Sequence, residues 1–214
     1  SPTGRSSDLG IYAYSGGGEI SITATGVVDA GDNGIEVRNY GTEGTTINAT
    51  NAAGDASVTG GNNGIYVYNQ FGTGAVNVTT NNVTGTNTNG INIRANGVGG
   101  TTVTATNSAG TANVTGDNFG VYVYNYYDAA NVTANNVSGD TSDGIYVRNA
   151  GASTDINVTT TGAVTSGSDD GIEARNYGTG TTTISSTNAA GDASVTGDDT
   201  GIYVYQNFAA GAVS

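Results

Sequence analysis

Apolar and polar residues alternate in short runs along this chain, and turn-forming residues separate the runs. The clearest run has the frame Gly-Ile-x-Val-x-Asn, as in GIEVRN at 34–39 and GIYVYN at 64–69. A period of two places Ile and Val on one face of a strand and the two variable residues on the other. Because no apolar period of 3.6 residues is present, the pattern predicts strands without helices.

The frame occurs eight times, which indicates a repeat protein. Successive leading glycines are 24, 30, 26, 30, 24, 27 and 30 residues apart. Each frame precedes a second alternating run, such as AVNVTT at 75–80, and a shorter third run, such as NNVTG at 81–85. Three strands and three turns per repeat predict an all-β fold, a right-handed parallel β-helix of about eight rungs. We expect one domain over residues 1–214.

A long internal duplication supports the β-helix. Residues 34–76 match residues 171–213 at 31 of 43 positions, at an offset of 137 residues. A solenoid grows by duplication of whole repeats, because each new repeat packs on a near copy of itself. A sandwich of short antiparallel strands is the alternative, since it also has short strands separated by turns.

Equivalent residues of successive rungs should stack about 4.8 Å apart in columns. The apolar frame positions then form two core columns, and the final Asn is expected to bond its neighbours' amides and the turn backbone. The core columns are Ile11, Ile35, Ile65, Ile91, Val121, Ile145, Ile172, Ile202 and Ala13, Val37, Val67, Ile93, Val123, Val147, Ala174, Val204.

The variable frame positions form two outer columns, which we call the Tyr/Arg face. They contain nine of the 13 tyrosines and four of the five basic residues. Arg in the second column should lie between Tyr rings, and the consecutive Arg148 and Arg175 should attract an ion, a carboxylate or a partner. The face either covers the sheet or binds a glycan, a host protein or a sister fibre. Its candidate binding residues are Tyr12, Tyr14, Arg38, Tyr66, Tyr68, Arg94, Tyr122, Tyr124, Arg148, Arg175, Tyr203 and Tyr205.

Three residues interrupt the first outer column. Glu36 and Glu173 lie two residues before Arg38 and Arg175 on the same expected outer face, so each could pair with its arginine. Asn92 takes the same place before Arg94.

Threonine is frequent in the second run and predicts an exposed column. A flat Thr array can order water, so ice binding is a further alternative, although Asn interrupts the neighbouring column. Thr is also a good exposed strand residue. The expected column is Thr23, Thr50, Thr79, Thr106, Thr133, Thr159 and Thr187.

Charge and composition exclude several functions. The net charge is −13, so the chain should repel nucleic acid and anionic membranes. Without His, Cys or Lys, it lacks the residues for Ser-His-Asp or Cys-His catalysis and for His or Cys metal sites. Two carboxylates could cleave a glycan, but most acids lie in repeated turns, so we expect no enzyme. No cofactor is expected. Calcium could bind the Asp-rich turns, and its best candidates are Asp169, Asp170, Asp198 and Asp199.

The stretches GDNGIEVRNYGTEGTTINAT and TSDGIYVRNAG resemble the DGIxxRN repeats of bacterial autotransporter and related secreted adhesin passengers. The resemblance implies a β-helical stalk at the bacterial surface, with a role in adhesion or aggregation. We therefore expect an extracellular structural protein, either a segment of an adhesin stalk or a subunit of an end-to-end fibre. A polysaccharide-binding or polysaccharide-cleaving β-helix is the alternative. Expected partners are copies of the chain, a glycan or a cell surface, without membrane insertion.

Overall fold

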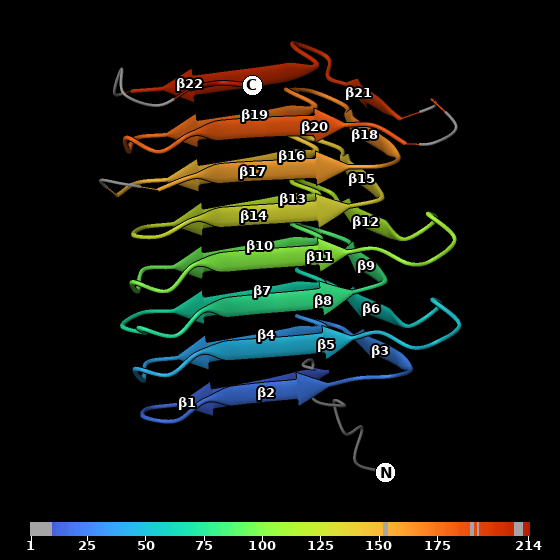
Figure 1. Ribbon diagram of the computed structural model, residues 1–214. Helices are drawn as coiled ribbons and strands as arrows, with labels where there is room; N and C mark the ends of the chain where they lie inside the picture. The colour runs from blue at the N-terminus through green and yellow to red at the C-terminus, as the bar shows by residue number, and fades with distance from the viewer. Residues whose placement is uncertain (1–9, 152–153, 189–190, 192, 208–211) are drawn as a thin grey trace.

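The computed structural model describes residues 10–151, 154–188, 191, 193–207 and 212–214 and shows a parallel β-solenoid (Figure 1). One eight-stranded and two seven-stranded parallel sheets wind in about seven turns, with three strands per turn. This confirms the all-β, three-strand prediction and excludes the antiparallel sandwich. In the described part of the chain, no helix is long and apolar enough to cross a membrane.

Each sheet collects the equivalent strands of successive turns. The frame sheet consists of β1 (Ile11–Ser15), β4 (Ile35–Asn39), β7 (Ile65–Asn69), β10 (Ile91–Ala95), β13 (Val121–Asn125), β16 (Ile145–Asn149), β19 (Ile172–Asn176) and β22 (Ile202–Gln206). The second sheet consists of β2 (Ile20–Thr23), β5 (Thr45–Ala49), β8 (Val76–Thr80), β11 (Thr101–Ala105), β14 (Ala130–Ala134), β17 (Ile156–Thr160) and β20 (Thr182–Ser186). The third sheet consists of β3 (Val27–Ala30), β6 (Ser57–Gly60), β9 (Asn82–Gly85), β12 (Asn113–Gly116), β15 (Asn136–Gly139), β18 (Ala163–Ser166) and β21 (Ser194–Thr196).

The frame sheet has the predicted register. Ile65 pairs with Ile91, and Ile91 with Val121, so the first core column stacks position by position. These side chains are fully buried, as are Val67 and Val123 of the second core column. Val and Ile fill this narrow interior because β-branched side chains pack well on a pleated surface.

The second sheet has a different register from the predicted threonine column. Thr79 pairs with Thr104 and with Asn48, whereas the prediction placed Thr106 and Thr50 there. Ser185, and not Thr187, lies opposite Thr159. The predicted column is therefore wrong at three of its members, and the true column includes Asn48 and Ser185. A flat, unbroken Thr array is not formed.

The leading glycine of the frame is required by close packing. A Cβ built on Gly90 would lie 2.6 Å from the carbonyl oxygen of Gly120 and 2.7 Å from Cγ1 of Val114. The corresponding glycines Gly64 and Gly120 are equally crowded. Their φ angles are not positive, unlike those of Gly54, Gly110 and Gly191 in the turns between the second and third sheets.

We therefore predict that Gly90→Ala destabilises the protein by about 1–3 kcal/mol, the usual cost of overpacking. The matched control is Gly26→Ala, because a Cβ at Gly26 meets no atom within 4 Å. Denaturant unfolding of both variants measures the difference. Equal free energies of unfolding would contradict the close-packing explanation.

Candidate functional site on the tyrosine and arginine face

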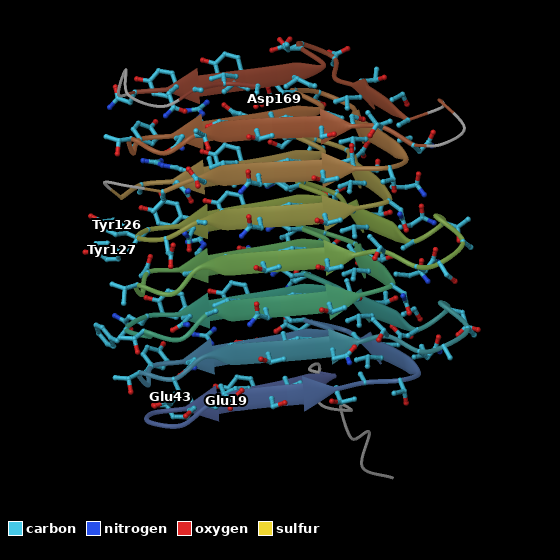
Figure 2. The ribbon with its side chains drawn as sticks, in the orientation of Figure 1. Glu19, Glu43, Tyr126, Tyr127 and Asp169 are labelled. Carbon is cyan, nitrogen blue, oxygen red and sulfur yellow. The ribbon has the colours of Figure 1, made fainter. Side chains whose placement is uncertain are left out.

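The frame sheet brings all twelve predicted binding residues onto its outer face. In-register pairing places Tyr66, Asn92 and Tyr122 side by side in the first outer column. Tyr68, Arg94 and Tyr124 adjoin them in the second column. Tyr126 and Tyr127 extend from the turn that follows β13, at the edge of the solenoid in the view of Figure 2.

The arginines contact tyrosine rings, but mostly not those of their own column. Only Arg148 packs on a ring of its own column, with its guanidinium carbon 5.4 Å from the Tyr124 ring centre. The other three cross diagonally to the first column of an adjacent rung, at 5.8–5.9 Å. The prediction of strict alternation within one column is therefore wrong for them. The diagonal pairs are Arg38 with Tyr66, Arg94 with Tyr122 and Arg175 with Tyr146.

Aromatic residues just outside the frame pack on rings of the second column in the rungs next to Arg38 and Arg175. The ring of Tyr40 lies 5.6 Å from that of Tyr14 and 5.7 Å from that of Tyr68, so these two rings pack on Tyr40 rather than on Arg38. Sequence reasoning missed this residue and its counterpart in the duplicated segment, Tyr177. Tyr177 contacts both Arg148 and Tyr205. Their shared place directly after the frame Asn was the available signal.

Two arginines have an internal carboxylate partner. Arg38 Nε donates to Glu36 Oε1 at 2.6 Å, and Asn33 Nδ2 donates to Glu36 Oε2 at 2.8 Å. Arg175 Nε donates to Glu173 Oε1 in the same way. These contacts confirm the predicted pairs and raise the pKa of both arginines. Both glutamates are buried, although their column was expected to face solvent.

The other two arginines of the Tyr/Arg face, Arg94 and Arg148, form no ion pair with any described residue. The guanidinium of Arg148 lies between two rings, 5.4 Å from Tyr124 and 4.7 Å from Tyr177. Its Nε is buried and has no hydrogen-bond acceptor in the described chain. Arg148 pairs in register with Arg175, so the Glu173 carboxylate is the counter-charge at the site where we expected one.

Glu173, the partner of Arg175, belongs to a group of three buried carboxylates. Asp143, Asp170 and Glu173 are each 7% exposed or less, and one oxygen of each lies within 4.8 Å of the others. Burial, together with the charge of Glu173, raises the pKa of Asp143 to about 8, and burial also raises the pKa of Asp170. Three such oxygens could share a proton or hold one divalent cation.

This group differs from the predicted calcium residues. Only Asp170 belongs to it, whereas Asp198 and Asp199 are exposed and Asp169 is partly exposed. Sequence reasoning missed Asp143 and Glu173 as members. The signal for Asp143 was its position before a frame glycine, one rung from Asp170.

The same positions hold amides in the N-terminal rungs. Asn63 Nδ2 donates to Asn33 Oδ1 at 2.9 Å, and Asn89 Nδ2 donates to Asn63 Oδ1 at 3.1 Å. In the duplicated segment, Asp170 replaces Asn33. A carboxylate thus lies near Glu173, whereas an amide donor lies beside Glu36. The charge of Glu173 adds to burial in raising the pKa of Asp143.

The final Asn of the frame forms only one of the two kinds of hydrogen bond that the sequence predicted for it. Asn39 Nδ2 donates to the carbonyl of Glu43 at 2.9 Å, and Asn176 Nδ2 donates to the carbonyl of Thr154 at 2.8 Å. The expected bonds to the turn backbone are therefore confirmed. The amide-to-amide bonds lie instead in the column of Asn33, Asn63 and Asn89, which precedes the frame.

Comparison of the chain with protein-family models, with curated proteins and with solved structures gives no match.

The buried carboxylates predict a pH dependence of stability. The pKa of Asp143 is about 8 in the folded chain against 3.8 for a free carboxyl group, so folding favours its protonated form. Its stabilising contribution is complete below pH 4 and is lost as the pH rises to about 8, by up to ~1.4 kcal/mol per pH unit. Asp143→Asn, which imitates Asn33 and Asn63, should reduce the loss of stability by the part that Asp143 contributes and should unfold at a higher temperature than the wild-type protein at pH 8.

Thermal unfolding between pH 4 and pH 8 with a chelator present measures this dependence. Asp198→Asn, which neutralises an exposed turn carboxylate, is the control. If the wild-type protein and Asp143→Asn lose stability equally over this range, Asp143 does not titrate as described.

Proposed function

We propose that this chain is a rigid structural segment of an extracellular bacterial surface protein, and that its Tyr/Arg face binds glycans. The observation that carries the proposal is the face itself, two adjoining columns of tyrosines and arginines along the frame sheet. The resemblance to autotransporter and adhesin passengers supports the location and the stalk-like role.

The solenoid is suited to hold this face in shape. Frame side chains such as Ile65, Ile91 and Val121 are fully buried beneath it, and each strand of the sheet pairs with its neighbours through every frame position. The outer side chains are therefore presented once per rung, about 4.8 Å apart, on a scaffold with little freedom to rearrange. A periodic, preorganised surface fits a periodic polymer, because little conformational entropy is lost on binding.

The chemistry of the face favours sugars over other ligands. Tyrosine offers an apolar ring that can cover the C–H face of a sugar and a hydroxyl that can bond to its oxygens. Arginine adds planar donors. The net charge of −13 disfavours nucleic acid, which is the other polymer that commonly binds Tyr and Arg surfaces.

The positions of the described carboxylates favour glycan binding over glycan cleavage. Asp143, Asp170 and Glu173 are gathered at one place, but they are buried and Glu173 is paired with Arg175. A pair of glycosidase carboxylates must flank the scissile bond, so it needs access to the substrate. The burial of these carboxylates and the pairing of Glu173 favour the structural and binding role over the cleaving alternative.

We predict that loss of one ring on the face weakens glycan binding. Tyr124→Ala should reduce affinity about 2- to 10-fold, because one aromatic contact stabilises by ~0.5–1.5 kcal/mol. The control is Tyr127→Ala, which removes an exposed ring on the adjoining turn. A glycan array followed by titration of the bound glycans measures the effect.

Two outcomes would contradict the proposal. Absence of binding to any glycan would exclude the binding role of the face. Release of reducing ends from a bound glycan would show that the chain is a glycan-cleaving enzyme.

A further inference from the structure

The Tyr/Arg face contains a pocket that we call the Arg94 pocket. It has a volume of about 350 Å³ and is lined by Tyr68, Arg94, Asn96, Tyr122 and Tyr124. These residues belong to β7, β10 and β13 and to the turn after β10, so three successive rungs contribute to it. The lining combines three aromatic rings, one cation and one amide.

Arg94 comes from the middle one of the three rungs that line the pocket. Its register neighbours are Tyr68 on one side and Tyr124 on the other, and its guanidinium carbon lies 5.8 Å from the ring centre of Tyr122. The arginine is nevertheless exposed. No described residue offers it a carboxylate within ion-pair distance.

The rung of Arg94 differs from the rungs of Arg38 and Arg175 in the residue two positions before the arginine. In two rungs, the residue two positions before the arginine is a glutamate that accepts a bond from it, Glu36 for Arg38 and Glu173 for Arg175. In the rung of Arg94 that residue is Asn92. Asn92 is only 7% exposed, and its Oδ1 accepts no hydrogen bond in the described chain. The rung of Arg94 thus has the arginine of the other two rungs, but Asn92 takes the place of the glutamate that pairs with it there.

We propose that the Arg94 pocket binds a sugar that carries a carboxylate, a uronic acid residue of an acidic polysaccharide. The carboxylate would accept two parallel bonds from the Arg94 guanidinium, as Arg–carboxylate pairs commonly do. The sugar ring would pack on the surrounding tyrosines, and the amide of Asn96 can donate to or accept from its hydroxyls. This inference rests on the proposed glycan-binding function and names the class of sugar.

The net charge of −13 does not prevent this binding. At physiological ionic strength the Debye length is about 8 Å, so most exposed acids of the chain act weakly on a ligand in the pocket. A carboxylate that is hydrogen-bonded to Arg94 is much closer than that. The remote acids instead oppose long-range attraction, so affinity should come from the contact itself.

A matched pair of oligosaccharides tests the proposal. One is a β-1,4-linked glucan, and the other is the same chain with each C6 oxidised to a carboxylate. Titration calorimetry at 0.15 M salt should show tighter binding of the oxidised chain by about tenfold, which is the usual effect of one charge-assisted hydrogen-bonded contact.

Three variants identify the contact. Arg94→Gln should abolish the preference for the oxidised chain. Asn92→Glu should also abolish it while leaving Arg94 in place, because the new carboxylate would rebuild the pair seen at Glu36 and Arg38. Arg38→Gln removes the same formal charge from the same face and should retain the preference. Melting temperatures show whether each variant is folded.

The outcomes separate this inference from the proposed function. Binding of both oligosaccharides without a preference, or a preference that folded Arg94→Gln and Asn92→Glu retain, would overturn the uronate site and leave glycan binding intact. If neither these oligosaccharides nor any glycan of the array binds, both proposals fail.

Discussion

In-register parallel stacking is the constraint on which the rest of this structure depends. Each residue of the frame lies beside its equivalents in the next rungs, about 4.8 Å away. Apolar columns gain from this arrangement, because Ile and Val pack on near copies of themselves. Charged columns are penalised by it, since like charges approach one another at every rung. Rings between arginines, together with Glu36 and Glu173 beside Arg38 and Arg175, offset this cost on the outer face.

The same constraint explains the two unusual sites. Asp143 and Asp170 occupy a column that holds Asn33, Asn63 and Asn89 in the N-terminal rungs. Stacking brings buried carboxyl groups together there, and burial raises the pKa of both. Where Asn92 occupies a glutamate position, stacking leaves Arg94 among rings without a carboxylate. One or two exchanges in the repeat therefore create a local charge imbalance that the neighbouring rungs do not correct.

Most of the fold could be predicted because the frame repeats with a constant parity of inner and outer residues. The threonine column failed because a shift of two residues keeps every side chain on its own face, so alternation alone does not choose between Thr104 and Thr106. The arginine contacts could not be predicted from the frame, since Tyr40 and Tyr177 lie just outside it. The burial of Glu36 and Glu173 depends on cover from adjacent side chains, which strand alternation does not describe.

Disulfide trapping tests in-register stacking most directly, because the chain has no cysteine of its own. Thr79 and Thr104 are register partners on the outer face of the second sheet. Their Cα atoms should lie about 4.8 Å apart, within disulfide range, whereas Thr79 and Thr106 should be about 8 Å apart. The account predicts that Thr79→Cys/Thr104→Cys forms a disulfide on oxidation and that Thr79→Cys/Thr106→Cys does not. Cross-linking of only the second pair, or of neither, would contradict it.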